Sequence, residues 1–131
     1  MKLLLDTHVW IWIYLEPWKV TSEVNQLLAD SHNELWLSPF SVWELIILLE
    51  KKRIRLNEDM GKWVEKSRHD LSLRDAPFTV EVAHELRFTL LDHRDPGDRF
   101  IVATAKAYGL TLVTADEKLI SAPGLAVLPN Q

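Results

Sequence analysis

The 131-residue chain contains no cysteine, which excludes disulfides and thiolate metal sites. Its glycines number only four, and they form neither a Gly-rich phosphate loop nor a dinucleotide-binding fingerprint. No serine nucleophile elbow occurs, and the segment Asp6-Thr7-His8 lacks the second aspartate of an aspartyl-phosphate phosphatase. Chemistry in this chain must therefore rest on other groups.

Long apolar runs are absent as well. The longest, such as Val9 to Leu15 and Leu45 to Leu49, fall far short of the ~20 residues that span a bilayer. The segment Met1 to Leu5 is similar to the start of a signal peptide, but Asp6 and His8 interrupt it and no small-residue cleavage site follows. We therefore expect a cytoplasmic protein with no membrane contact.

The chain has no excess of basic residues. A net charge of -4 at pH 7 argues against a general nucleic-acid coat, because such proteins are usually basic. It does not exclude a nuclease, since carboxylates gathered around metal ions make the net charge more negative while the bound ions restore positive charge locally. With 47% hydrophobic residues, the chain is long enough to bury a core, and we expect one domain over residues 1–131.

Short apolar segments alternate with helical patterns. The predicted strands are residues 2–5, 35–37, 71–73, 110–113 and 125–128. The predicted helices are residues 7–14, a segment capped by Thr21 or Ser22, residues 39–52, a segment capped by Asn57, residues 80–91, and a helix from Pro96 that ends at Gly109. This order predicts an α/β fold, a three-layer single domain with a central parallel sheet flanked by helices.

Acidic residues occupy four positions that the predicted elements make special. Asp6 follows the first strand, Glu44 lies inside an apolar helix, Asp98 is in the first turn of a helix, and Asp116 follows a late strand. Each has a purely structural alternative: Asp6 ends a strand, and Asp98 forms a capping box with Asp95. Because the carboxyl ends of parallel strands meet at one edge, where α/β sheets bind ligands, coincidence is the weaker explanation for all four.

The two remaining acids have alternatives of the same kind. Glu44 pairs with Ser41 in one capping scheme, but Ser38-Pro39 is the stronger helix start and leaves Glu44 beyond the first turn. Thr114 and Glu117 form a capping box three residues apart, so we expect Asp116 to be left for another use. Oxygen ligands alone favour Mg²⁺ or Mn²⁺ over Zn²⁺, and the five histidines show no pair at metal-ligand spacing.

Four segments together resemble a known family. Residues 3–8 with Trp10, residues 41–44 followed by Lys52 and Arg53, the segment His93-Arg94-Asp95-Pro96-Gly97-Asp98-Arg99, and residues 112–116 resemble the PIN-domain ribonucleases, specifically the VapC-like toxins of bacterial type II toxin–antitoxin modules. The resemblance implies a parallel sheet flanked by helices and RNA cleavage that depends on Mg²⁺ or Mn²⁺. It also implies that Asp6, Glu44, Asp98 and Asp116 are the catalytic and metal-binding acids.

The resemblance assigns accessory roles too. Asp95 belongs to a His-Arg-Asp-Pro-x-Asp-Arg signature, in which Gly97 stands where a bulkier residue is more common. Thr7 and Thr114 match hydroxyls that orient metal or water, with plain helix capping as the alternative. Candidate phosphate contacts are Arg99, Lys118 and the run Lys51-Lys52-Arg53. For the run, which follows a buried helix, the alternative is a solvated charge that is favourable at the helix C-terminus.

Partners and alternatives complete the expectations. The resemblance implies an RNA substrate and a cognate antitoxin whose C-terminal segment wraps the toxin, and we expect that segment to place an Arg or Lys against Asp6, Glu44 or Asp98. A homodimer is expected through helix 7–14 or helix 39–49, because both are apolar nearly all round. The alternatives are a catalytically silent PIN-like module that binds RNA or protein, and a housekeeping RNA-processing nuclease.

Overall fold

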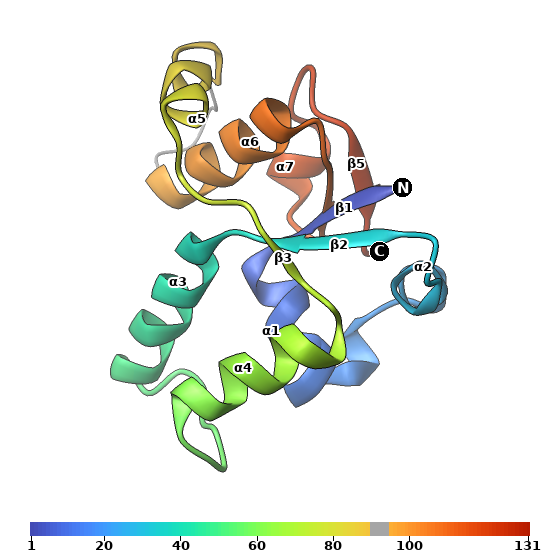
Figure 1. Ribbon diagram of the computed structural model, residues 1–131, viewed down its shortest axis with the longest axis vertical. Helices are drawn as coiled ribbons and strands as arrows, with labels where there is room; N and C mark the ends of the chain where they lie inside the picture. The colour runs from blue at the N-terminus through green and yellow to red at the C-terminus, as the bar shows by residue number, and fades with distance from the viewer. Residues whose placement is uncertain (90–94) are drawn as a thin grey trace.

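The computed structural model describes residues 1–89 and 95–131. Within them one five-stranded parallel sheet has the order β3-β2-β1-β4-β5, so the first strand lies at its centre. Figure 1 shows this sheet crossing the middle of the molecule. The strands are β1 (Lys2–Leu5), β2 (Glu34–Leu37), β3 (Arg74–Asp75), β4 (Thr111–Thr114) and β5 (Val127–Pro129).

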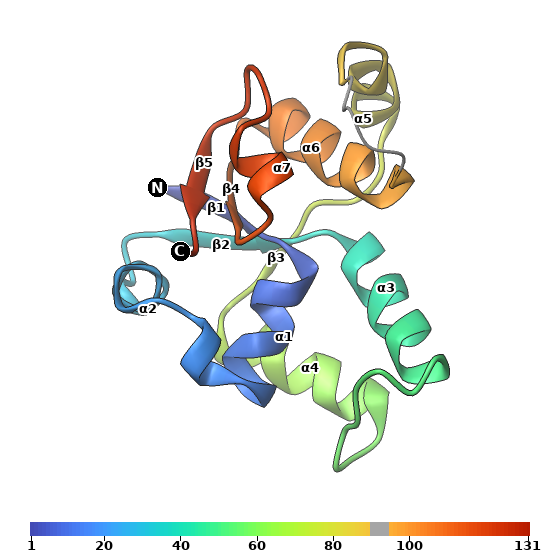
Figure 2. The same cartoon turned by 180° about the vertical axis from the view of Figure 1, so that it is seen from behind.

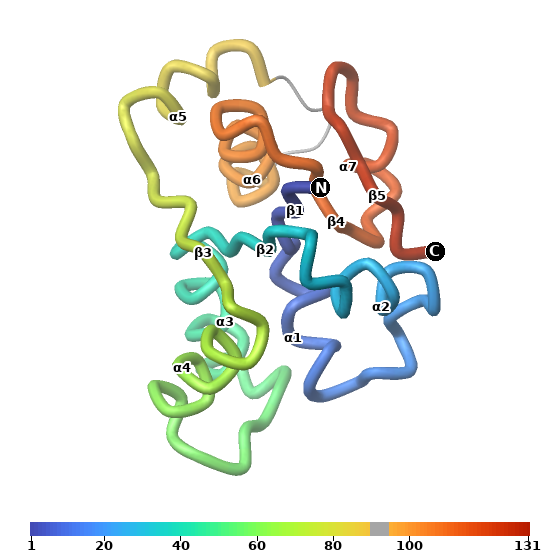
Figure 3. Tube along the Cα trace, turned by 45° about the vertical axis from the view of Figure 1, so that its right-hand side comes forward, coloured from blue at the N-terminus to red at the C-terminus, as the bar shows by residue number. Residues whose placement is uncertain are grey.

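Helices cover both faces of the sheet. Figures 1 and 2 show α1, α3 and α4 on one side of the sheet and α5, α6 and α7 on the other. Figure 3 shows the chain passing from the first group to the second through the segment that contains β3. This arrangement confirms the predicted three-layer α/β fold. The helices are α1 (Thr7–Leu15), α2 (Ser22–Ala29), α3 (Pro39–Glu50), α4 (Met60–Asp70), α5 (Val80–Glu85), α6 (Pro96–Tyr108) and α7 (Glu117–Ile120), with 3-10 turns η1 (Pro17–Lys19) and η2 (Leu86–Phe88).

The side chains of β1 point alternately to the two faces of the sheet and so pack against both helix layers. Successive side chains of a strand point to opposite faces of the sheet. Leu3 and Leu5 accordingly pack in the core cluster that contains Trp10 of α1, whereas Leu4 packs in the cluster that contains Ile101 of α6. A continuous apolar run is therefore what a strand buried on both faces requires, and all three leucines are fully buried.

Side-chain hydrogen bonds satisfy the polar atoms of the α1–α4 core. The indole Nε1 of Trp10 donates to Ser67 Oγ of α4 at 3.1 Å, and Ser67 Oγ in turn donates to the carbonyl of Val64 at 2.8 Å. A fully buried tryptophan needs such a partner for its N–H. No helix in the described residues is both long enough and apolar enough to cross a membrane.

Several predicted boundaries were wrong. The third strand lies at Arg74–Asp75, not at residues 71–73, because Leu71 and Ser72 instead end α4 in a turn in which Ser72 has a φ of 49°. The fourth helix is capped by Asp59, which accepts a hydrogen bond from the Lys62 amide, and not by Asn57.

Two further boundaries differ at the ends of elements. Helix α5 ends at Glu85 and continues only as η2 to Phe88, while the rest of the predicted helix, residues 90 and 91, lies outside the described residues. Strand β5 includes Pro129, which pairs with Thr114. Proline is tolerated there because β5 is an edge strand.

Candidate active site

Two of the predicted acids follow neighbouring strands. Strands β1 and β4 pair in parallel, and Asp6 and Asp116 come just after their carboxyl ends. The Asp6 amide continues the ladder by donating to the Val113 carbonyl at 3.0 Å. Both acids also begin helices: Asp6 Oδ1 accepts from the Thr7 amide, and Asp116 Oδ1 accepts from the Lys118 amide, each at 2.9 Å. The sheet therefore delivers both side chains to one edge.

Helices supply the other two predicted acids. Glu44 lies in the second turn of α3, after the Ser38 cap and Pro39, and Asp98 lies in the first turn of α6. All four acids, together with Asp95, line one cleft of about 340 Å³, hereafter the acid cleft. Its other lining residues are His8, Trp12 and Ala115.

The two threonines singled out in the sequence contact these acids directly. Thr114 Oγ1 donates to Asp6 Oδ2 at 2.6 Å and accepts from the Asp116 amide at 3.1 Å. Thr7 Oγ1 lies 2.6 Å from Glu44 Oε1 and 2.8 Å from Ser41 Oγ. Since Thr7 has a single hydroxyl hydrogen, it donates to the Glu44 carboxylate and accepts from Ser41. Each threonine therefore fixes the orientation of one acid.

One expectation about capping was wrong. The predicted box between Thr114 and Glu117 would leave Asp116 without a capping role, but Asp116 itself is the N-cap of α7. The Thr114 hydroxyl is instead occupied by Asp6 and by the Asp116 amide. The short distance between strand end and helix start explains this, because the residue that leaves the strand is already next to the helix amides.

Burial and mutual repulsion raise the pKa values in the acid cleft. Burial is the largest cause of the raised pKa of Asp98, about 7, and the carboxylates of Asp95, Asp116, Asp6 and Glu44 add to it. Burial likewise raises the pKa of Glu44, to which Asp6 and Asp95 contribute while the Thr7 hydrogen bond opposes them. Burial also raises the pKa of Asp6, against the opposing hydrogen bond from Thr114.

The donor set fits a hard divalent cation. Within residues 1–89 and 95–131, no three His, Asp or Glu side chains already stand together as a ligand cluster. The fit rests instead on chemistry: carboxylate oxygens suit Mg²⁺ and Mn²⁺, and a cation would relieve the repulsion that raises the pKa of Asp98. The groups that share the cleft with Asp98 and carry this repulsion are Asp95, Asp116, Asp6 and Glu44.

Arg99 and Gly97 have structural contacts. The Arg99 guanidinium donates to the carbonyls of Thr89 at 3.0 Å and Leu86 at 2.8 Å, so it binds the end of η2 rather than lining the acid cleft. A Cβ at Gly97 would lie 3.1 Å from Phe40 Cε1, so glycine allows α6 to approach Phe40 closely. His93 and Arg94 of the family signature lie outside the described residues.

Sequence reasoning gave no site role to Trp12, which lines the acid cleft. Trp12 was read only as part of an apolar helix, yet it lines the cleft beside His8. The two rings have centroids 5.9 Å apart. Their spacing of four residues places them on one face of α1, and because that helix starts at Asp6, this face is the one next to the acids. That spacing was the available signal.

Comparison with known proteins agrees with this geometry. The PIN domain family model matches residues 3–125. Ribonuclease VapC22 of Mycobacterium tuberculosis (strain ATCC 25618 / H37Rv) is 32% identical over 120 residues, which cover 91% of this chain and 90% of that protein.

Solved structures share the fold. VapBC2 from Rickettsia felis bound to a DNA fragment from its promoter matches with a TM-score of 0.72 and 20% identity over the whole of both chains. FitAcB from Neisseria gonorrhoeae matches with a TM-score of 0.63 and 26% identity over 98% of this chain and 97% of that chain. A toxin–antitoxin complex from Klebsiella pneumoniae matches with a TM-score of 0.61 and 19% identity over 98% of each chain. The sheet order, the family match and the curated relative agree, and the chain belongs to the PIN-domain family.

Proposed function

We propose that this chain is a metal-dependent endoribonuclease and the toxin of a type II toxin–antitoxin system, acting in the cytoplasm. The observation that carries the proposal is the meeting of Asp6, Glu44, Asp98 and Asp116 in one cleft, where burial and repulsion raise the pKa of Asp98. The similarity to Ribonuclease VapC22 indicates RNA as the substrate class. Intact acids favour an enzyme over a silent binding module.

The proposed roles follow from the contacts. Asp6 and Asp98 would hold Mg²⁺ or Mn²⁺ directly, and Asp116 would be a further ligand, direct or bridged by water. When bound, such an ion supplies an activated water and neutralises charge on the phosphate. Thr114 holds Asp6 for ligation through its 2.6 Å hydrogen bond. Thr7 occupies Glu44 Oε1, which leaves Oε2 to bind the ion or to accept a proton from the attacking water.

The test is RNA cleavage by purified protein with and without metal. Asp6→Asn and Asp98→Asn should abolish Mg²⁺-dependent cleavage while leaving the fold intact, because an amide keeps the shape of the carboxylate and loses its charge. Asp70→Asn, a carboxylate at the end of α4 that does not line the acid cleft, is the matched control and should cleave normally. Full cleavage by the wild type in EDTA would refute the metal-dependent mechanism.

A homodimer through α3 is part of the proposal. In the other helix considered, α1, Val9, Trp10 and Ile11 are buried in the core, and the remaining apolar side chains are only partly exposed. On α3, by contrast, Trp43 is 52% exposed and its ring lies 5.1 Å from that of Phe40. Exposed aromatic groups of this kind are typical of protein interfaces. Sedimentation of the purified protein tests this assignment.

A cognate antitoxin is the remaining proposed partner. The Klebsiella pneumoniae neighbour is a toxin–antitoxin complex, and the acid cleft of this chain is a suitable receptor for a basic side chain. We place an antitoxin Arg or Lys against Asp6, Glu44 or Asp98, where a guanidinium pairs with carboxylates. A gene for a small DNA-binding protein beside this one would distinguish a toxin from a housekeeping RNA-processing nuclease.

A further inference from the structure

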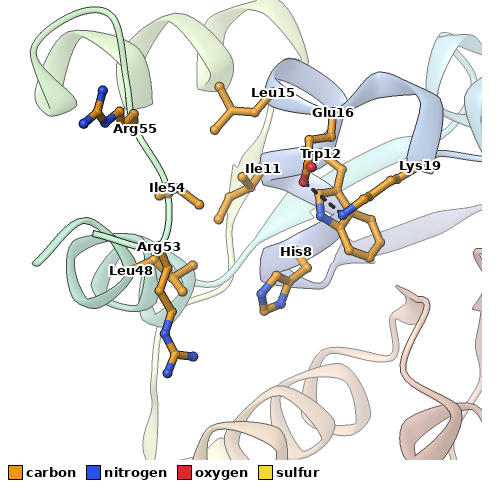
Figure 4. Close-up of a pocket in the computed structure, with 10 residues that line it drawn as sticks. All are labelled: His8, Ile11, Trp12, Leu15, Glu16, Lys19, Leu48, Arg53, Ile54 and Arg55. Carbon is orange, nitrogen blue, oxygen red and sulfur yellow. Dashed lines mark ion pairs between the residues drawn. The ribbon is translucent and has the colours of Figure 1, made fainter. Parts of the chain in front are cut away.

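A second pocket adjoins the acid cleft. It has a volume of about 500 Å³, lies between α1 and the segment that follows α3, and shares His8 and Trp12 with the acid cleft. We call it the flanking pocket. Figure 4 shows Ile11, Leu15 and Ile54 facing its interior, with Arg53 extending to the same side as His8. A volume of this size is in the range of small-ligand sites, and the shared residues place the two hollows side by side.

The charge of the flanking pocket is opposite to that of the acid cleft. Lys19, Arg53 and Arg55 line it, and Glu16 is its single acid. Glu16 already pairs with Lys19 at 3.2 Å, so it does not neutralise the arginines. A ligand that spans both hollows would meet the proposed metal site in the acid cleft and the cationic side chains in the flanking pocket. Both would attract negative charge, so this arrangement suits a polyanion.

The two arginines of the flanking pocket differ from the other described arginines. Within residues 1–89 and 95–131, the guanidinium groups of Arg53 and Arg55 form no ion pair or hydrogen bond. Each of the others has a polar partner: Arg68 binds Glu65 and Asp75, Arg74 binds Glu34, Arg87 binds the His84 carbonyl, and Arg99 binds the carbonyls of Leu86 and Thr89. Among the described arginines, the two without a polar partner are thus the ones that line the flanking pocket beside the acid cleft.

Trp12 borders both hollows. Its ring is partly exposed, with Lys19 Nζ 5.3 Å from the ring centroid and His8 stacked at an angle nearby. Single-stranded nucleic acids bind proteins through aromatic rings that stack on bases and cations that contact phosphates. Both elements are present here in two adjacent hollows.

Resting on the proposed ribonuclease function, we propose that the flanking pocket binds the stretch of single-stranded RNA next to the scissile phosphate, with one base against Trp12 and neighbouring phosphates against Arg53 and Arg55. Charge complementarity and the adjacency of the acid cleft favour RNA over a protein segment. These residues are positioning residues for the substrate. The occupant is defined by its chemistry, a flexible strand with one anionic group per unit.

The first test measures binding of a short fluorescein-labelled single-stranded RNA of random sequence by anisotropy, at several NaCl concentrations. Asp98→Asn serves as the background, so that the probe survives. Adding Arg53→Gln and Arg55→Gln should weaken binding about tenfold and lower the slope of log affinity against log salt by about 1.4, since each phosphate contact contributes roughly 0.7. Lys2→Gln with Lys106→Gln, at the opposite edge of the sheet, removes the same charge and should leave affinity within about twofold.

The second test separates stacking from charge. Trp12→Leu should weaken binding about fivefold or more, whereas Trp12→Tyr should retain most of the affinity because it keeps a ring. Thermal unfolding checks that each variant folds. Should Trp12→Leu fail to fold, the exposed arginines decide the matter alone.

The outcomes distinguish the two proposals. Failure of the wild type to cleave RNA would refute the ribonuclease function. Normal cleavage by the wild type, together with unchanged RNA affinity and salt slope after loss of both arginines, would overturn only the flanking-pocket proposal and would leave the pocket as a protein-docking surface.

Discussion

The raised pKa of Asp98 gives a stability prediction that needs no substrate. The folded protein holds a proton on this carboxyl up to about pH 7, whereas the unfolded chain releases it near the ordinary value of 3.8. Between these values the folded state binds more protons, so stability falls as pH rises and stays reduced above pH 7. Asp98→Asn removes the penalty. The variant should therefore be more stable than the wild type at pH 8 and about equal to it near pH 4.

The expected gain in stability of Asp98→Asn follows from the same two pKa values. A shift from 3.8 to about 7, at about 1.36 kcal/mol per pKa unit, sets an upper bound of roughly 4 kcal/mol. The side chain of Asp98 is partly exposed, so solvent screening reduces the expected gain to about 1–2 kcal/mol. That is large enough to measure in a domain whose total stability is typically about 5–15 kcal/mol.

The assay is urea unfolding in EDTA, followed by tryptophan fluorescence from pH 4 to pH 8. The difference between variant and wild type at each pH cancels the titration of other groups. Asp70→Asn is the control, and its difference from the wild type should not vary with pH. Added Mg²⁺ should stabilise the wild type more than Asp98→Asn. A variant that is no more stable than the wild type at pH 8 would refute the argument from repulsion.

The remaining predictions concern positioning and partners. Thr114→Val should lower the free energy of unfolding in urea by about 1.5–3 kcal/mol, because the Asp6 carboxylate loses a hydrogen bond. The control, Thr104→Val, loses only a hydrogen bond to a backbone carbonyl and should lower it by about 1 kcal/mol. Equal losses of stability in the two variants would contradict this explanation. Trp43→Glu should convert a dimer to a monomer in sedimentation, and an unchanged mass would exclude this face of α3. Calorimetry with an antitoxin C-terminal peptide should show binding weakened more by Mg²⁺ than by Na⁺ at equal ionic strength; identical affinities would place the antitoxin elsewhere.

The fold was predictable wherever local signals were strong. Strand β1 is specified by its run of apolar side chains. The start of α3 is specified by the Ser38 cap and Pro39, and the end of α6 by Gly109 in the left-handed conformation. Residues 71–73 were wrongly predicted to form a strand. Their apolar–polar–apolar pattern fits a strand, but it also fits a turn whose leucines pack into the core. Only the pairing of β3 with β2, a non-local contact, decides between them.

The acids of the site were predictable for a related reason. Asp6, Asp98 and Asp116 sit at element boundaries, which sequence patterns locate well. Trp12 was missed because its role depends on a neighbouring segment, the one that carries Arg53 and closes the flanking pocket. The direction of the Arg99 guanidinium was also unpredictable, since its carbonyl partners on η2 are fixed by tertiary packing.

The central place of β1 has a consequence for how the protein is made. Asp6 leaves the ribosome early, but its neighbour in the sheet, β4, is translated about a hundred residues later. Before that point β1 lacks one flanking strand, and Thr114 and Asp116 do not exist to complete the cleft. The acid cleft is therefore complete only after β4 and Asp116 have been synthesised. A proteolytic cut between Asp6 and β4 would likewise place Asp6 and Asp116 on separate chains.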